Sequence, residues 1–365
     1  MKYVDEFRDP RAVRELVEAI SRIRAPRVRL MEVCGTHTMS IARYGLRELM
    51  WERAELISGP GCPVCVTPQG DIDWFLEAAR LPHVIAATFG DMMRVPGSHF
   101  SLEQARAQGA DVRVVYSPAD AVELAQRNPE RQVVFFGVGF ETTAPAVAMS
   151  LLEAKRDGVA NYAVFCAHKL IPPALRGLVE APDFAVNGFI LPGHVSAIIG
   201  SRPYEFLARE HRVPCVIAGF EPVDVVQAVR MLLLQIAEGR SEVEIAYGRA
   251  VSPEGNPKAR AVVSEVFEVM DARWRGLGEV PASGLAINAG HAAFDARRRI
   301  EVSPPPAVEP KGCRCGEVLK GALAPEQCAL FGNRCTPRVP VGPCMVSSEG
   351  ACAARYRYGG VEGGA

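Results

Sequence analysis

Ser58-Gly59-Pro60-Gly61-Cys62-Pro63-Val64-Cys65 follows the short apolar run Glu55-Leu56-Ile57 and places two thiols on one constrained loop. Glycine adopts backbone angles that are closed to other residues, and proline fixes its own. Such a loop holds two sulfur atoms in place and lets another group approach closely. Because it follows a predicted strand, the loop indicates a unit of an α/β fold, with functional groups beyond the strand end.

Short apolar strands and helices alternate on both sides of this loop. Strands are expected at 28–33, 55–57, 83–89, 112–116, 132–138, 162–167, 188–191 and 214–218, and helices at 10–23, 39–50, 69–80, 102–108, 119–127, 223–237 and 259–273. Such alternation predicts βαβ units and mainly parallel sheets. Segments 136–141 and 216–221 both place Gly-Phe-Glu after an apolar strand. This similarity indicates either two domains of similar architecture or a chance likeness between strand ends. We therefore expect two similar Rossmann-like α/β domains.

The chain of 365 residues is long enough for two or three domains. We expect the following division: an N-terminal helix in 1–27, α/β domain I in 28–145, α/β domain II in 146–280, a small cysteine-rich domain in 281–358 and a disordered tail in 359–365. The change of character after residue 280, with Pro-rich and Gly-punctuated pieces of little periodicity, marks the start of the third domain.

Charge and hydropathy exclude several classes of protein. The formal net charge is −1, so no global field attracts nucleic acid or an acidic membrane. No apolar run reaches the roughly 20 residues that span a bilayer, and the first residues lack the apolar core of a signal peptide. We expect a cytoplasmic protein with neither nucleic acid nor membrane as a partner. Eleven cysteines in that reducing compartment point to metal or redox chemistry.

Six cysteines lie in the C-terminal segment, at positions 313, 315, 328, 335, 344 and 352. Thiolates are soft ligands that suit iron–sulfur clusters or zinc. Zinc sites usually use compact paired ligands, whereas only Cys313 and Cys315 form a close pair here. This spacing favours a 4Fe–4S cluster wrapped by loops and leaves two cysteines over for a redox pair, with zinc as the alternative.

Four earlier loops carry further candidate groups. Cys34-Gly35-Thr36-His37-Thr38 places a thiol, two hydroxyls and an imidazole on one loop, which suits metal binding or proton transfer but also a capped strand-to-helix turn. Cys62 and Cys65 suit a redox dithiol or half a metal site, or are simply buried. Glu141 opens a helix and His194 stands alone, so both also fit structural roles. Because the Cys34, Cys62/Cys65 and Glu141 loops all follow predicted strands, we expect them to lie together at one edge of a sheet. Cys166 and Cys215 lie inside strands and are interpreted as core.

Taken together, these motifs resemble those of the HypD family of hydrogenase maturation proteins. The matching segments, in chain order, are 34–38, 59–65, 139–143, 191–196, 315–319, 331–332 and 344–352. Each motif alone is weakly specific, but their order and number are highly specific, and they cover nearly the whole chain.

The resemblance implies a role in making the active-site iron of NiFe hydrogenases. It implies two Rossmann-like domains and a third domain with a 4Fe–4S cluster. It also implies that the chain and HypC together hold a transient iron that receives two cyanides and one carbonyl, with cyanide delivered by HypE after synthesis with HypF. By this likeness Cys34 is the iron-binding thiolate, Cys62 and Cys65 are a nearby redox dithiol, and the site is lined by Thr36, His37, Thr38, Glu141 and His194.

For the cluster, the resemblance favours Cys313, Cys328, Cys335 and Cys352 as ligands and Cys315 with Cys344 as a redox pair, similar to the arrangement in ferredoxin–thioredoxin reductase. The spacing leaves open whether Cys313 or Cys315 is the ligand. The role expected is an assembly scaffold with redox activity rather than a conventional turnover enzyme. The alternative is an iron–sulfur dithiol oxidoreductase without a second iron at Cys34.

Overall fold

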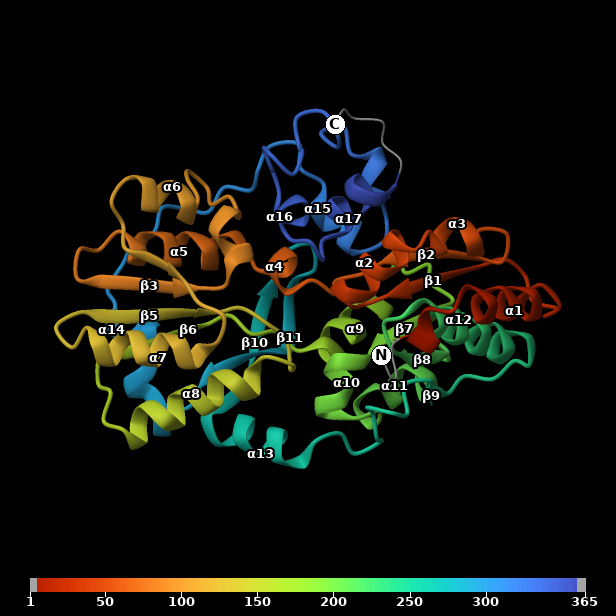
Figure 1. The fold of residues 1–365 in the computed structure, drawn as a ribbon, viewed down its shortest axis with the longest axis horizontal. Helices are drawn as coiled ribbons and strands as arrows, with labels where there is room; N and C mark the ends of the chain where they lie inside the picture. Colours follow the sequence, from red (N-terminus) through yellow and green to blue (C-terminus); the bar gives the residue numbers. More distant parts are fainter. Residues whose placement is uncertain (1–4, 360–365) are drawn as a thin grey trace.

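The computed structural model describes residues 5–359 and contains two separate parallel β-sheets flanked by helices (Figure 1). A two-stranded antiparallel hairpin lies between the sheets, and a compact C-terminal unit lies above their junction. The expectation of two Rossmann-like α/β units with a smaller cysteine-rich segment is confirmed at the level of architecture.

The first sheet has the order β2-β1-β7-β8-β9 and all neighbours are parallel. Its strands are β1 (Val28–Glu32), β2 (Ala54–Ser58), β7 (Gly188–Pro192), β8 (Cys215–Ala218) and β9 (Val243–Ile245). The register pairs Glu32 with Ser58, so that β1 and β2 end side by side. The loops that follow these two strands therefore leave the sheet at the same point.

The second sheet has the order β4-β3-β5-β6 and is also parallel. It is built from β3 (Val84–Thr88), β4 (Val112–Val114), β5 (Gln132–Gly137) and β6 (Tyr162–Cys166). The hairpin consists of β10 (Phe267–Trp274) and β11 (Gly278–Ile287). Glycines at positive φ, Gly276 and Gly278, make the tight turn between these two strands possible.

The helices follow the strands in alternation. Those on the side of the first sheet are α1 (Pro10–Ser21), α2 (Gly35–Arg43), α3 (Leu46–Met50), α9 (Ile171–Val179), α10 (Gly193–Ile199), α11 (Glu205–Arg209) and α12 (Pro222–Ala237). Those near the second sheet are α5 (Gln69–Ala79), α6 (Leu102–Ala107), α7 (Pro118–Arg127), α8 (Ala144–Arg156), α13 (Pro257–Val266) and α14 (Ala296–Arg299). The short α4 (Pro63–Val66) lies between the two sheets, and the C-terminal unit contains α15 (Cys315–Leu319), α16 (Pro343–Val346) and α17 (Ala351–Tyr358). The 3₁₀ helices are η1 (Asp5–Arg8), η2 (Gly90–Arg94), η3 (Arg202–Tyr204), η4 (Ala289–Phe294) and η5 (Pro325–Gln327).

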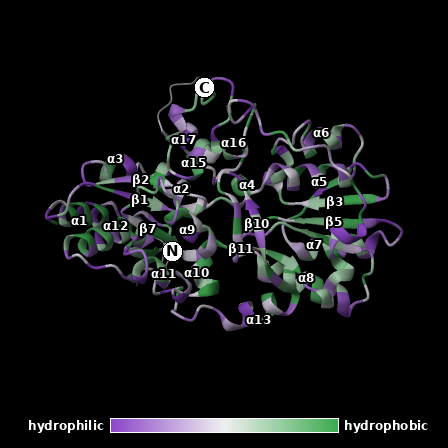
Figure 2. Ribbon diagram, turned by 180° about the vertical axis from the view of Figure 1, so that it is seen from behind, coloured by the Kyte–Doolittle hydropathy of each residue, from purple (hydrophilic) through white to green (hydrophobic). Residues whose placement is uncertain are grey.

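Three hydrophobic clusters hold these layers together. One packs a face of the first sheet against α1, α2 and α12, and a second packs a face of the second sheet against α7, α8 and the hairpin. The largest cluster joins the remaining faces of both sheets to α4, α5, α9 and the C-terminal unit. Figure 2 shows hydrophobic residues along β3 and α8, as expected for elements that face a core. The shared core makes the two sheets and the C-terminal unit parts of one packed molecule.

The strand pairing does not follow the expected domain boundary at residue 145. The first sheet combines β1 and β2 with three strands from beyond residue 187, and the second takes β6 from the expected second domain. The chain leaves the first sheet after β2 and returns to it at β7. The alternation of strands and helices in the sequence could not predict this path, because it does not indicate which strands pair with each other.

Two predicted elements are also different. The helix expected at 259–273 ends at Val266, and the chain continues as β10, whose buried residues pair with β11. The helix expected at 39–50 is divided into α2 and α3 by Gly45, which has φ +63°. The predicted tail lies outside the described residues, except for Gly359.

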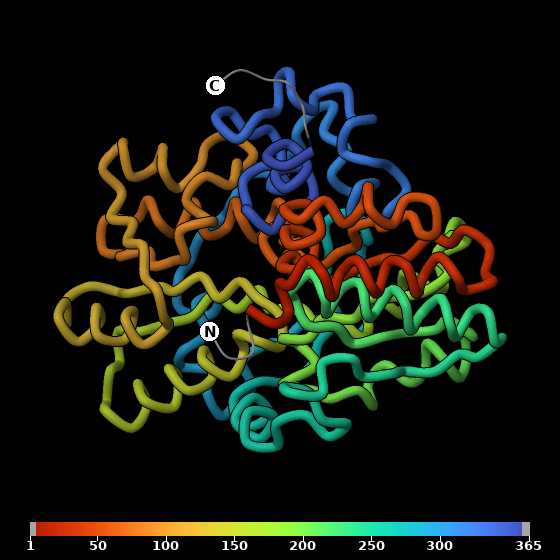
Figure 3. Tube along the Cα trace, turned by 45° about the vertical axis from the view of Figure 1, so that its right-hand side comes forward, coloured from red at the N-terminus to blue at the C-terminus, as the bar shows by residue number. Residues whose placement is uncertain are grey.

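The C-terminal unit packs against elements from both ends of the large core. Helix α17 lies against α2, and α16 lies against α4. Figure 3 shows this unit above the two lobes, with α1 running alongside α12 below it. Within residues 5–359, no helix is both long and apolar enough to cross a bilayer.

Candidate functional site

The loops after β1 and β2 meet at their first residues. Gly35 N donates a 2.8 Å hydrogen bond to Gly61 O. A Cβ atom on Gly61 would lie 2.2 Å from Cys34 N and 2.3 Å from Val33 C, so only glycine permits this approach. Strand register and a glycine contact thus bring Cys34 beside the Cys62/Cys65 loop. These two loops lie together, as predicted.

Cys62 and Cys65 form a disulfide across α4 in this structure. Cys62 is the N-cap of α4, its Sγ accepts a hydrogen bond from Cys65 N, and Pro63 occupies the first helical position. Both cysteines are buried. The pair therefore has the geometry of a closed dithiol held at the start of a helix.

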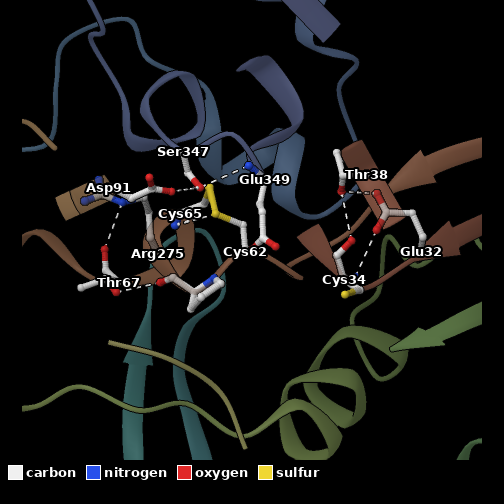
Figure 4. The surroundings of a disulfide bond; sticks show 11 residues. Glu32, Cys34, Thr38, Cys62, Cys65, Thr67, Asp91, Arg275, Ser347 and Glu349 are labelled. Carbon is white, nitrogen blue, oxygen red and sulfur yellow. Dashed lines mark hydrogen bonds between the residues drawn. A yellow bond between two sulfur atoms is a disulfide. The ribbon is translucent and has the colours of Figure 1, made fainter. Parts of the chain in front are cut away.

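Cys34 is a buried thiol between two carboxyl groups. Cys34 N donates to Glu32 Oε2 at 3.1 Å, and Thr38 Oγ1 donates to Glu32 Oε1. On the other side, Thr36 Oγ1 donates to Glu349 Oε1 at 2.9 Å. Burial, followed by the charge of Glu349, raises the pKa of Cys34 to about 12, and burial raises that of Glu32 to about 7. Figure 4 shows Glu349 between Cys34 and the disulfide.

His37 and His194 both pack against the ring of Phe220. The Phe220 ring centroid is 4.8 Å from that of His37 and 3.9 Å from that of His194. His37 Nε2 hydrogen-bonds Gly219 O at 2.8 Å, while its Nδ1 is buried without a partner among the described residues. Burial lowers the pKa of His37 to about 4, which keeps the imidazole neutral. His194 is exposed. The two predicted histidines are therefore brought together with the Cys34 helix.

Glu141 lies at the end of a different sheet from Cys34. It follows β5, so the expectation that the Cys34, Cys62/Cys65 and Glu141 loops share one sheet edge is wrong. Glu141 Oε1 accepts from Ile171 N at 2.9 Å, and Oε2 is buried without a partner among the described residues. Burial raises its pKa to about 7. Through Ile171, the first residue of α9, Glu141 links the end of the second sheet to a helix on the side of the first sheet.

The C-terminal cysteines surround a small enclosed space. Five of them line it, namely Cys313, Cys315, Cys328, Cys335 and Cys352. The sulfur atoms of Cys313 and Cys315 are 3.3 Å apart. A Cβ on Gly342 would lie 2.5 Å from Cys313 Sγ, so this glycine leaves room for the sulfurs. Cys344 is fully buried behind the cavity, where the thiols of Cys315 and Cys352 raise its pKa.

A set of soft donors around one apolar cavity fits a polynuclear iron–sulfur centre. No three His, Cys, Asp or Glu side chains in residues 5–359 are gathered as ligands for a single metal ion. The C-terminal unit that holds this cavity contacts the disulfide helix α4 through α16, and it contacts the Cys34 helix α2 through α17 and through Glu349, which accepts from Thr36 Oγ1. The geometry thus unites the thiol loops with the cysteine-rich unit.

Comparison with known proteins identifies the family. A family profile named HypD, described as "Hydrogenase formation hypA family", matches residues 11–359. The chain belongs to the HypD family. It is 49% identical to "Hydrogenase maturation factor HypD" of Rhodobacter capsulatus, with 99% of both chains covered. It is 51% identical to "Hydrogenase expression/formation protein HupD" of Azotobacter chroococcum (98% of this chain, 97% of that protein) and 49% identical to the Escherichia coli HypD factor (98% of both).

Three residues of this HypD-family site were not predicted as site residues from the sequence. Glu32 lies inside a strand, Glu349 lies in the matching segment 344–352 but is 313 positions from Thr36, and Arg275 reaches the disulfide loop from the hairpin. Arg275 is buried, and it bonds Thr67 O and Gln69 Oε1 directly after α4. Only the tertiary fold brings these charges to the thiols. Cys215 is fully buried as predicted, whereas Cys166 is half-buried and lines a cavity, so the interpretation of Cys166 as core is wrong.

Proposed function

We propose that this chain is a maturation factor for NiFe hydrogenases, in which Cys34 binds the iron that is being assembled. In the proposal, HypC contributes a second ligand, HypE delivers cyanide prepared with HypF, and the finished iron unit with two cyanides and one carbonyl passes to the hydrogenase large subunit. The observation that carries the proposal is the buried Cys34 thiol between two carboxyl groups and beside a disulfide.

The surroundings of Cys34 favour a cationic cargo. The same negative groups that disfavour a lone thiolate stabilise a metal cation beside it. Thr36 and Thr38 hold Glu349 and Glu32 in place through hydrogen bonds, so both carboxyl groups are oriented before the cargo arrives. The thiolate is a soft ligand that suits iron carrying cyanide and carbonyl. Scaffold chemistry of this kind requires binding and release rather than rapid turnover.

The cysteine cavity of the C-terminal unit supports a 4Fe–4S cluster. Cys313, Cys328, Cys335 and Cys352 would hold it, with Cys315 as the alternative to Cys313. Such a cluster supplies single electrons when it is bound. Cys344, on the helix that packs against α4, lies behind this cavity next to Cys315. In the proposal a Cys315/Cys344 dithiol reduces the Cys62–Cys65 disulfide by thiol–disulfide exchange: the Cys62–Cys65 bond breaks, a Cys315–Cys344 disulfide forms, and two electrons and two protons pass to Cys62 and Cys65.

A dithiol oxidoreductase is the second candidate function. The observation that favours it is the Cys62–Cys65 disulfide, which packs directly against the cysteine-rich unit. That function needs the two cysteine pairs but no iron at Cys34. A variant of Cys34 therefore separates the two candidates.

The test is hydrogenase maturation in cells that lack their own HypD-family protein and receive this chain. Cys34→Ala should abolish hydrogenase activity, and the control Cys215→Ala, which removes a buried thiol from the same sheet, should leave most of it intact. Full activity with Cys34→Ala would overturn the scaffold role and leave the oxidoreductase.

A further inference from the structure

A further cavity lies beside the second sheet, and Cys34 is not among its lining residues. It has a volume of about 800 Å³ and lies where β6 ends, between the start of α5 and the hairpin β10–β11. Its walls include Cys166, His168 and Lys169, which directly follow or end β6. In open α/β sheets, ligands bind beyond the carboxyl ends of the strands, and a volume of this size suits a small molecule.

Lys169 supplies a buried cation with little to hold it. Its side chain is only 6% exposed, and its nearest acidic partner is Asp71 Oδ2 at 3.8 Å, beyond hydrogen-bond distance. A buried ammonium group is costly unless it is paired, and burial lowers the pKa of Lys169 accordingly. The cavity therefore presents an ammonium group that lacks a close counter-ion.

The acidic groups of the cavity are held by other partners. Asp71 Oδ1 accepts from Arg297 at 2.7 Å, which draws this carboxylate away from Lys169. Glu309 pairs with Arg275, and Asp271 accepts from Ala282 N at 2.8 Å. Asp295 caps α14, and Glu279 lies opposite Arg273 in the hairpin register. Asp71, Asp271, Asp295 and Glu309 thus each have a close donor or cation, whereas the nearest carboxylate oxygen of Lys169 lies 3.8 Å away.

The rest of the wall near Lys169 is rigid and specific. His168 lies under the turn after β5, where Cβ atoms on Gly137 and Gly139 would come within 3.1 and 3.3 Å of its ring. Its Nε2 hydrogen-bonds Thr143 Oγ1 at 3.2 Å, and its Nδ1 faces Cys166 Sγ at 3.5 Å. Cys166 Sγ donates to Leu285 O. A fixed arrangement of this kind suits recognition of a ligand rather than filling of a core.

We propose that this cavity is a second ligand site, which binds a small molecule with a carboxylate or phosphate group on Lys169. The anion pairs with the Lys169 ammonium more closely than Asp71 does at 3.8 Å, and the body of the ligand lies against the β10–β11 hairpin. The site lies at the second sheet, and its lining does not include Cys34.

The test is thermal unfolding of the full chain with its cluster under anaerobic conditions, with inorganic phosphate and with acetate as probes. Sodium chloride at equal ionic strength is the reference, because salt screens exposed charges. A probe at about ten times its Kd should raise Tm by about 2 °C. Hydrogen exchange should slow in peptides that contain 166–170 and 270–275. Stabilisation by phosphate alone would assign a phosphorylated ligand, and stabilisation by acetate would assign a carboxylate.

Lys169→Met should abolish the probe-dependent shift. The matched control is Lys155→Met, because the Lys155 ammonium lies at the surface beside Gly290 O; this variant should keep the shift. If Lys169→Met does not fold, Arg297→Gln serves instead, since it frees Asp71 to neutralise Lys169 and should also weaken binding. Phosphate also stabilises proteins without binding a site. Equal shifts in the wild type and in the Lys169 or Arg297 variant, or no shift with either probe, would overturn the proposal.

Discussion

At the scale of single residues, buried ionisable groups of this chain are concentrated around the junction of the two sheets. Glu32, His37 and Glu141 are all buried, and the pKa of each is displaced toward its neutral form by burial. Such groups cost stability when they carry charge. Groups of this kind are typical of functional sites, where a bound ligand such as a cation offsets the cost of burying them. Glu141 allows this cost to be measured, because one of its oxygens lacks a partner among the described residues.

Glu141 should make stability depend on pH. The folded protein keeps this proton up to about pH 7, whereas the unfolded chain loses it near 4.5, so unfolding releases a proton between these values. The free energy of unfolding therefore falls as pH rises through this window. Glu141→Gln lacks this proton release. Between pH 4.5 and pH 8, the difference in free energy of unfolding between variant and wild type should therefore shift by about 3 kcal/mol in favour of the variant.

Urea unfolding of both proteins at the two pH values measures this change. The control is Glu130→Gln, which changes an exposed carboxylate. A pH dependence that is identical in the wild type and Glu141→Gln would show that Glu141 is charged in the folded protein at neutral pH.

At the scale of elements, the junction depends on glycines that allow backbones to touch. Gly61→Ala would push a methyl group into the backbone of Val33 and Cys34, which cannot move aside as a flexible side chain would. We expect a loss of about 3 kcal/mol in the free energy of unfolding and displacement of the Cys34 loop. The matched control is Gly70→Ala on α5, where nothing lies within 4 Å of the added Cβ; it should gain about 0.5–1 kcal/mol. Equal effects of the two substitutions would contradict the close approach of the loops.

The local sequence pattern predicted most elements, because the periodicity of apolar residues in strands and helices can be detected within short stretches of sequence. The prediction of one helix at 259–273 was wrong because neither Val266 nor Phe267 is a helix-breaking residue. Residues 267–274 form a strand because they pair with β11. Pairing partners are set by packing over long distances. The same limit explains why Cys34 and the Cys62/Cys65 loop were grouped correctly through adjacent strands, whereas Glu141 was placed on the wrong sheet edge.

At the scale of the whole molecule, the C-terminal unit depends on elements that could not stand alone. Its helices have only 5, 4 and 8 residues, well below the length at which isolated helices are stable. Contacts such as Arg355 with Glu48 and Thr36 with Glu349 attach the unit to the first sheet. Loss of the proposed cluster should therefore loosen this unit first.

Removal of iron by anaerobic chelation tests that expectation. Hydrogen exchange in 311–359 should accelerate at least about tenfold, whereas the strands of both sheets should stay protected because each sheet also packs on a second face whose core cluster contains no C-terminal cysteine. Cys335→Ser should reproduce the effect, and Cys215→Ala should not. Unchanged exchange in 311–359 after complete removal of iron would mean that packing alone orders the unit.

The central claim, that Cys34 holds the iron under assembly, is tested most directly by infrared spectroscopy of this chain purified without oxygen together with HypC. Cyanide and carbonyl ligands of iron absorb where protein is nearly transparent. We predict such bands in the wild-type complex and their loss in Cys34→Ala with HypC still bound. Their absence from a wild-type complex that has an intact cluster, or their persistence in Cys34→Ala, would contradict the account.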